Sequence, residues 1–469
     1  MRLVAALLSS FLVAAAAVGD PAGSLPRSSI PAKDLAKYGK DVNTFFEALA
    51  GADLESQDKS LDSIEKESKA QAKRAKLDDP LKYVGDWDLA LELAKPEDRN
   101  LKGHYGKGFF RHVYTYLGDP NPKKKDDDVA VVCLVSIPSS YGKDESLLPV
   151  VVGVKPKLDL KGAELEAKAT EMANAMYSDL LETAIVIVPL GQEQGAGRER
   201  GTTEPEGTWM AADGLFTFSM SLNVLLEQLR FDRARVVLDG WGDAGLDATQ
   251  LATNLPSWFA GLINRSGETG DEHVIYDNLR GVPELYLNGA GDKRTVDLEA
   301  LKGRKADVTV VEEAGSALAP SEETRKSVAT WVGERKRDLA PALVDHRIGN
   351  VDFQFVDWIL ASDPRLRANA RPTDADFPHV KAQIDRDTNT VKIETVNVLE
   401  LKVFLSDALV DLDKPVVIEV NGKKISEKTY RRELRSMLEN RFRTDAYSGI
   451  YTADVVVTDI EPNVPEKAQ

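Results

Sequence analysis

Cysteine is nearly absent from this chain, since Cys133 is the only one among 469 residues. A single cysteine excludes an intramolecular disulfide and leaves none to carry a lipid after the amino-terminal apolar run. Paired cysteines and the His-x-x-x-His spacing are missing too, so no pattern typical of zinc is present. Asp374 and Asp376 could contribute oxygen ligands to calcium, although charged turns are the commoner explanation. We therefore expect no metal site. We also expect no cofactor, because the glycines around Gly195 do not match a dinucleotide or phosphate loop.

Positive charge is also scarce. The 60 Lys and Arg residues are outnumbered by 76 Asp and Glu, which gives a formal net charge of −16. Nucleic-acid phosphates require a basic surface, so the composition predicts no nucleic-acid partner. The same balance disfavours anionic membrane surfaces. Hydrophobic residues at 42% and charged residues at 29% are ordinary for a soluble globular protein.

Long apolar runs are missing except at the amino terminus. Met1 and Arg2 precede the apolar run Leu3 to Val18, and Gly19-Asp20-Pro21 ends it. A run shorter than the roughly 20 residues of a membrane span, with small residues before the break, is typical of a cleavable signal peptide. We expect cleavage after about residue 19, a secreted or periplasmic protein, and no integral membrane segment afterwards. Export without disulfides favours a bacterial source.

The remaining chain divides by pattern into a short leader and three larger parts. The leader covers 20–31, and residues 32–100 show helical spacing of apolar residues. In 101–340, apolar strands alternate with helices, whereas 347–462 is rich in alternating strands and contains the hairpin signal Asn421-Gly422. The predicted class is α/β: a mostly parallel sheet with helices on both faces, preceded by a helical region and followed by a smaller β-rich domain.

Several elements are predicted individually. A helical pattern predicts a helix over Leu246 to Ile263, and an amphipathic pattern predicts another over Ser426 to Phe442. Five short apolar runs predict strands of one mostly parallel sheet: Val150 to Val154, Ala184 to Leu190, Arg235 to Leu238, Glu284 to Leu287 and Val308 to Val311.

The most informative stretch runs from Val236 to Gly245. An apolar strand leads into small residues, and a helical pattern follows. A strand joined to a helix by so sharp a turn needs small residues two before and two after its centre, since strand and helix nearly touch. Gly240 and Ala244 meet that demand, which makes Gly242 the centre of the turn.

Residues from about 105 to 338 resemble a secreted α/β-hydrolase of the esterase or polyester-depolymerase type. The resemblance places Gly242 where the family has its nucleophilic serine, Asp292 at the acid position and Ser316 at the position of the histidine base. Lys155 and Pro156 stand where the family's His-Gly contributes amides to an oxyanion hole, and proline has no amide hydrogen to offer. The resemblance therefore implies the fold together with a degenerate triad.

Ordinary serine hydrolysis is not expected from these residues. Gly242 cannot attack and Ser316 cannot act as a base, so Asp292 has nothing obvious to orient. Asp243 is an alternative nucleophile, but centring the turn on it would put Trp241 where a small residue is required. A base would still be missing, because neither His273 nor His346 follows the last strand in the turn where the family has its histidine.

Three functions stay open on this evidence. The first is a non-catalytic, hydrolase-like protein that binds a protein or polysaccharide ligand. The second is an esterase or peptidase with a rearranged site. The third is a structural component of the cell envelope, since a fold by itself does not fix a function.

Overall fold

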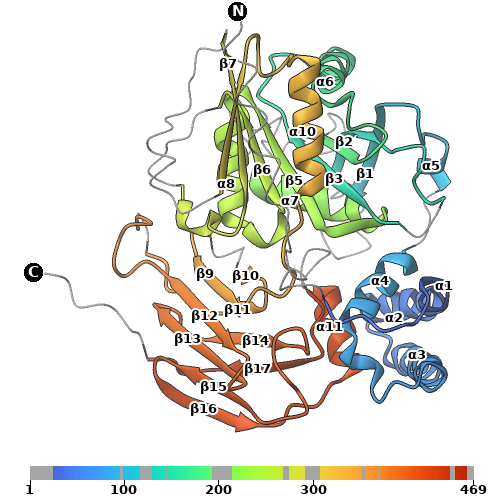
Figure 1. Ribbon diagram of the computed structural model, residues 1–469, viewed down its shortest axis with the longest axis vertical. Helices are drawn as coiled ribbons and strands as arrows, with labels where there is room; N and C mark the ends of the chain where they lie inside the picture. The colour runs from blue at the N-terminus through green and yellow to red at the C-terminus, as the bar shows by residue number, and fades with distance from the viewer. Residues whose placement is uncertain are drawn as a thin grey trace, which may run out of the picture.

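The structure is a computed structural model, and it describes residues 25–95, 99–116, 129–143, 146–192, 214–267, 274–290, 307–350, 354–367, 370–443 and 449–461. The expected signal peptide, 1–19, lies outside these residues. Figure 1 shows two lobes, one built around a large sheet and one that combines helices with smaller sheets. We call them the sheet lobe, from 99 to 338, and the mixed lobe, from 25 to 95 and from 339 to 461.

The sheet lobe contains eight described strands in the order β1-β2-β4-β3-β5-β6-β7-β8. Only β2 runs antiparallel to its neighbours, β1 and β4. All five predicted strands lie in this sheet, which confirms the prediction. The strands are β1 (Phe110–Tyr116), β2 (Val129–Ser136), β3 (Leu148–Val154), β4 (Ile185–Gln192), β5 (Phe231–Trp241), β6 (Gly261–Arg265), β7 (Glu284–Gly289) and β8 (Val308–Glu313).

Helices cover both faces of this sheet, as the continuous apolar strands require. Val150 and Val152 of β3 join the core beneath one pair of helices, whereas Val151 joins the core on the opposite face. Alternate residues of a strand point to opposite faces, so a strand covered on both sides must be apolar throughout. The first core contains side chains of α7 (Gly214–Glu227) and α8 (Gly245–Asn254), the second those of α6 (Gly162–Tyr177) and α10 (Glu322–Glu334).

The predicted helix from Leu246 to Ile263 is wrong in its second half. Helix α8 ends at Asn254, a 3₁₀ turn covers Pro256–Trp258, and Gly261–Arg265 is strand β6. Proline cannot continue the ladder of helical hydrogen bonds, and it disfavours helical geometry at the residue before it. The end of the expected helix thus belongs to the buried strand β6, which lies between β5 and β7.

The mixed lobe joins the two ends of the chain in one hydrophobic core. Phe45 and Trp87 from the amino-terminal helices belong to the same cluster of buried side chains as Leu405 and Leu438 from the carboxyl-terminal part. Separate cores for these two regions are therefore not formed. The helices are α1 (Ala32–Leu35), α2 (Gly39–Ala50), α3 (Leu54–Ala75) and α4 (Val84–Ala94), with 3₁₀ turns at Ala36–Tyr38 and Pro80–Lys82.

The described strands of the mixed lobe form two further sheets. One has the order β10-β11-β14-β17 and the other β16-β15-β13-β12-β9. The strands are β9 (Leu343–Arg347), β10 (Phe355–Val356), β11 (Ile359–Ala361), β12 (His379–Asp385), β13 (Thr390–Val396), β14 (Leu401–Leu405), β15 (Val416–Val420), β16 (Lys423–Lys428) and β17 (Ala453–Val457). Both sheets contribute to the shared core.

One local prediction in this lobe is confirmed and another is wrong. Asn421 and Gly422 have φ of 50° and 74° and connect β15 to β16, as the hairpin signal predicts. The helix expected from Ser426 begins only at Leu434, as α11 (Leu434–Arg443). Its first residues instead pair with β15 as an edge strand.

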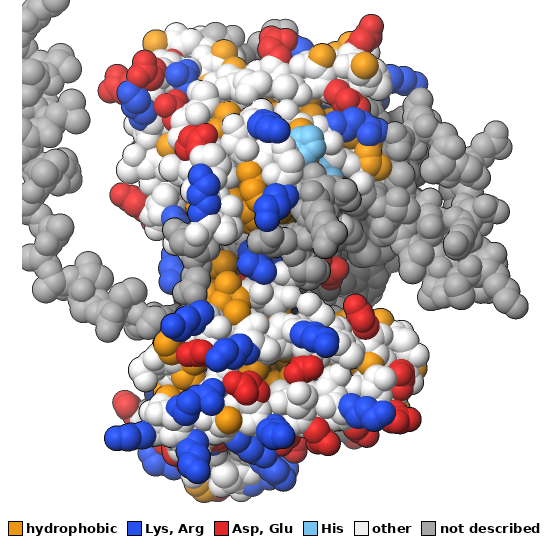
Figure 2. Space-filling view, turned by 90° about the vertical axis from the view of Figure 1, so that its right-hand side faces the viewer, with side chains coloured by type: hydrophobic (Ala, Val, Ile, Leu, Met, Phe, Trp, Pro, Cys, Tyr) orange, Lys and Arg blue, Asp and Glu red, His pale blue; other side chains and the backbone are white. Residues whose placement is uncertain are grey.

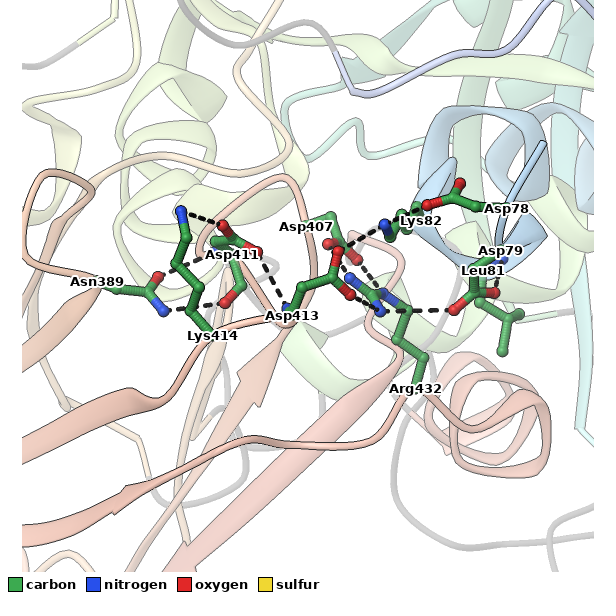
Figure 3. A network of polar contacts seen from close by, with 10 residues as sticks. All are labelled: Asp78, Asp79, Leu81, Lys82, Asn389, Asp407, Asp411, Asp413, Lys414 and Arg432. Atoms are coloured by element: carbon green, nitrogen blue, oxygen red, sulfur yellow. Dashed lines mark hydrogen bonds and ion pairs between the residues drawn. The ribbon is translucent and has the colours of Figure 1, made fainter.

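Charged side chains reinforce the contact between the helices and strands of the mixed lobe (Figure 3). Arg432 donates to both carboxylate oxygens of Asp407 at 2.6 and 2.5 Å, and to Asp413 at 2.8 Å. Asp413 also lies 2.5 Å from Lys82, which pairs with Asp78 at 2.5 Å. Hydrogen bonds from Lys82 to Asp413 and Asp78 raise the pKa of Lys82. The network links the turn before α4 to two loops of the β-rich part.

Buried charges also connect the two lobes. Arg233 of β5 pairs with Asp88 of α4, and its Nε lies 3.7 Å from Glu92 Oε1 of the same helix. Lys95, which follows α4, lies 2.6 Å from Glu92 and donates to two carbonyl oxygens near the end of α7 at 3.0 and 3.1 Å.

Within the described part of the chain, no helix is long and apolar enough to cross a membrane.

Candidate functional site

Strands β5 to β8 end at one edge of the large sheet. Trp241 of β5 is in register with Arg265 of β6, which is in register with Leu287 of β7, and Leu287 pairs with Val311 of β8. In a parallel sheet, the segments that leave such strands begin side by side, and ligands of open α/β sheets bind in the crevice there. The turn after β5 and the loop after β8 belong to this edge.

The turn after β5 has the geometry that the sequence predicts. Gly242 has a φ of +54°, the left-handed region where glycine is unstrained, and it opens the short turn into α8. A Cβ atom on Gly240 would lie 2.7 Å from both Ala248 Cβ and Gly245 Cα. Strand and helix therefore leave no room for a side chain at Gly240. A Cβ on Gly242 would meet only Leu318 Cδ1, at an ordinary 3.5 Å.

The loop after β8 approaches this turn. Leu318, whose methyl group faces Gly242, donates its amide to Ser316 Oγ at 3.2 Å. Glu313 at the end of β8 closes the loop, since it accepts from the amides of Gly315 at 3.1 Å and Ser321 at 2.9 Å. Hydrogen bonding, from Thr324 first and then from Ser321 and Gly315, lowers the pKa of Glu313 to about 2. The structure thus brings Gly242 and the Ser316 loop to one place.

Asp292, the predicted acid, lies outside the described residues, so its position stays a prediction. Strand β7 ends at Gly289, and the amide of Ala290 donates to Glu313 O at 2.9 Å. The chain therefore leaves β7 beside β8, on the same edge as the turn after β5. His273 also lies outside the described residues.

Lys155 and Pro156 occupy the edge beside the turn. Val154, the last residue of β3, is in register with Gly240 of β5, so the chain leaves β3 at the same edge of the sheet as the turn after β5. Lys155 is 5% exposed, which the sequence did not indicate. Pro156 has no amide hydrogen, so its backbone cannot donate a hydrogen bond at this edge.

Asp243 is exposed in the short turn that begins at Gly242. The positive φ falls on Gly242, and Trp241 is completely buried. If Asp243 were the centre of the turn, Trp241 would take the place of Gly240, where even a Cβ overlaps its neighbours. The geometry therefore favours Gly242 as the centre and disfavours an aspartate nucleophile.

A buried polar network lies at the end of β5, and sequence reasoning missed it. Arg265 donates to both oxygens of Asp239 at 2.8 to 3.0 Å, and both side chains are completely buried. Tyr177 donates to Asp239 at 3.0 Å and accepts from the Trp241 indole at 2.7 Å. Burial, and then the neighbouring Asp239, raise the pKa of Tyr177 well above its usual value, so the hydroxyl stays protonated. Arg265 also reaches Ala317 O at 3.4 Å, and this contact connects the network to the Ser316 loop.

Histidine does not supply a base at this edge among the residues that are described. Four of the five histidines are described, and they lie in or before β1 or in the mixed lobe: His104, His112, His346 and His379. His379 contacts Asp345 at 2.7 Å, and burial lowers the pKa of His346 to about 4. His346 lies in β9 and His379 in β12, both of which belong to the mixed lobe. Within the described residues, no group of three or more His, Cys, Asp or Glu is placed to hold a metal ion.

The strand order with β2 reversed, together with the tight turn from β5 into α8, defines an α/β-hydrolase-like fold. No family model and no curated protein matches the chain. Several solved structures match, and they include esterases and other hydrolases. A thermostable esterase is 15% identical with a TM-score of 0.37, and the match covers 50% of this chain and 64% of that one.

Two further solved structures give the same result. An S-formylglutathione hydrolase from Agrobacterium tumefaciens is 14% identical over 49% of this chain and 96% of its own, with a TM-score of 0.32. An esterase from Pseudomonas putida ECU1011 is 12% identical over 52% and 89%, with a TM-score of 0.33. These TM-scores are low, and the fold assignment stands on the strand order and the turn geometry.

Proposed function

We propose that this chain is an exported, non-catalytic α/β-hydrolase-like protein that binds a protein or polysaccharide ligand at the carboxyl edge of its large sheet. The observation that carries the proposal is the turn at Gly242. Its left-handed backbone and the close contact at Gly240 are those of a nucleophile turn, but its central residue has no side chain.

The surroundings of the turn support a binding role over hydrolysis. The family resemblance assigns Lys155 and Pro156 to the place of the oxyanion-hole amides, and Ser316 to the place of the base. A triad that lacks its nucleophile typically loses about a million-fold in turnover. The ordered turn and the loop held by Glu313 still form a defined surface on which a ligand can be recognised.

The catalytic half of the proposal is tested with activated esters of short and long acyl chains and the purified full-length protein. We expect release no faster than with a heat-inactivated sample, and no change for the Asp292→Ala variant. Turnover that is lost in Asp292→Ala or Asp243→Asn would instead establish an ester hydrolase with a rearranged site.

The binding half is tested by blocking the edge. Gly242→Phe places a large side chain against Leu318, and Gly422→Phe is the matched control, because Gly422 also has a positive φ and an open Cβ position. Ligands retained from a panel of polysaccharides and envelope proteins should bind the control and not Gly242→Phe. Equal binding by both variants would place the ligand elsewhere and contradict the proposal.

A further inference from the structure

A cavity of about 280 Å³ lies at the junction of the two lobes. Phe259 and Val282, which precede strands β6 and β7, line it from the sheet lobe, whereas Leu343 and Asp357 line it from the mixed lobe. Strands β9 and β10, which belong to this junction, lie just below the large sheet in Figure 1. Because β6 and β7 begin beside the cavity, it lies at the edge of the sheet opposite to Gly242.

The charged groups that line the cavity are not balanced. Arg280 pairs with Asp345 at 2.6 Å, and Arg337 pairs with Asp357 at 3.2 Å. These two pairs use both of the arginines that line the cavity. The third carboxylate of the lining, Asp338, forms no ion pair with another described residue. The cavity therefore has one carboxylate more than its arginines neutralise.

The surroundings of Asp338 do not replace this missing cation. Many charged side chains of the protein lie at the outer surface, where water solvates them, as on the face shown in Figure 2. Asp338 is instead half-buried, and its Oδ1 accepts from the amide of Ala340 at 2.8 Å. Burial raises the pKa of Asp338, although the nearby Arg386 and Arg337 oppose the rise. Arg386 does not line the cavity, and it donates to the carbonyl oxygen of Ala408.

The same cavity has an apolar rim. Leu343 is 51% exposed, which makes it one of five large apolar side chains that the described residues leave exposed. It belongs to β9, which is the last strand in the order of its sheet. Phe259, Val282 and Val356 also line the cavity, and they are buried. The cavity thus combines an unpaired carboxylate with exposed apolar surface.

We propose that this cavity binds a small organic cation, in which an amino or guanidino group is joined to an apolar body. The cationic group pairs with Asp338, and the apolar body covers Leu343. Ligand pockets usually measure about 300–1,000 Å³, so this one is at the small end of the range. At about 30 Å³ for a water-sized group, it holds about ten non-hydrogen atoms. A neutral ligand would leave the charge of Asp338 unbalanced, and an anion would add to it.

The experiment titrates the full-length protein with three probes that share a phenyl group, and follows binding by ligand-observed NMR at neutral pH. The probes are the cation 2-phenylethylamine, the neutral 2-phenylethanol and the anion 3-phenylpropionate. Asp338→Asn removes the charge and keeps an oxygen for the Ala340 amide. Asp232→Asn is the matched control, because Asp232 is also half-buried and accepts from the amide two residues on, at 3.0 Å, but does not line the cavity.

A second pair of variants tests the apolar rim without touching a buried group. Leu343→Gln removes the exposed apolar side chain of the cavity. Leu54→Gln is its control, since Leu54 is 68% exposed at the start of α3 and does not line the cavity. Thermal melting checks that all variants are folded. If Asp338→Asn is unfolded, the comparison of Leu343→Gln with Leu54→Gln decides.

We expect the wild type to bind the amine about tenfold or more tightly than the alcohol, because a hydrogen bond to a charged group contributes on that order. Asp338→Asn should lose this preference, whereas Asp232→Asn should keep it. Leu343→Gln should bind the amine about fivefold more weakly, because covering about 40 Å² of apolar surface contributes roughly that factor. Leu54→Gln should bind it like the wild type.

The blocked variant Gly242→Phe separates this proposal from the one on the Gly242 edge. It should bind the amine like the wild type, because the cavity lies at the opposite edge of the sheet. Four results would overturn the proposal: no preference of the wild type for the amine over the alcohol, tighter binding of 3-phenylpropionate, equal losses in a variant and its matched control, and loss of amine binding in Gly242→Phe.

Discussion

The ion pair between Asp239 and Arg265 offers the sharpest test of how the turn after β5 is held. Both side chains are completely buried, and the Arg265 guanidinium donates to both carboxylate oxygens. Removing one partner leaves the other charge buried without compensation, which typically costs about 3–5 kcal/mol. Asp239→Asn and Arg265→Met should each reduce the free energy of unfolding by about that amount.

The double variant distinguishes a buried pair from two independent residues. With both charges removed, no uncompensated charge remains, so we expect the double variant to lose about 2–3 kcal/mol less than the sum of the single losses. Arg325→Met is the control, because Arg325 pairs with Asp179 at 2.7 Å but both are about a quarter exposed. This variant should cost about 1 kcal/mol or less.

The assay is urea unfolding followed by tryptophan fluorescence, in which Trp241 reports on the network through its bond to Tyr177. The reasoning fails if the two single variants cost no more than Arg325→Met, or if their losses are additive. Either result would mean that the pair is hydrated or rearranged.

Other consequences can be measured on the same edge of the sheet. Gly240→Ala should lower the free energy of unfolding by about 1–3 kcal/mol, because the added methyl group overlaps α8. Gly242→Ala should lower it by only about 1–2 kcal/mol, because alanine is strained at a positive φ. Urea unfolding measures both values. Glu313 has a lowered pKa, so its contribution is present above its ordinary value of 4.5 and is lost as pH falls towards about 2. The gap in melting temperature between the wild type and Glu313→Gln should therefore narrow over that range. Gly242→Ser combined with Ser316→His should place the two side chains within about 2.6–3.2 Å, and a crystal structure with them on different sides of the loop would contradict the assignment. Mass spectrometry of the native protein should find a start near Gly19, and an intact signal segment would refute export by cleavage.

The sheet could be predicted from sequence because strands buried on both faces are short, apolar and unbroken. Strand β6 escaped detection since Gly261–Arg265 follows an amphipathic helix at a spacing that continues its pattern. Pro256 was the available signal for the break. The late start of α11 has a related cause. Strand β16 is mostly exposed, with Ile425 outward, so it carries no buried alternation that could identify it.

The shared core of the mixed lobe was beyond sequence reasoning for another reason. Helical periodicity shows that one side of a helix is buried, but it does not show what covers that side. Trp87 of α4 and Leu405 of β14 lie in one cluster although more than three hundred residues separate them. The ion pair between Asp239 and Arg265 was also beyond sequence reasoning. The sequence placed Arg265 after a helix, whereas it lies at the end of strand β6, beside β5.

At the turn after β5, packing requires a glycine at residue 240 but not at residue 242. Gly240 is required by packing, because Ala248 and Gly245 leave no space for a Cβ atom, and the latter is itself packed against Gly267. Gly242 is not required by packing, since a Cβ atom there has room. The fold of the turn therefore depends on the small residues around its centre, whereas it does not require a particular side chain at residue 242. The proposal of a non-catalytic role thus rests on the identity of residue 242 and not on the shape of the turn.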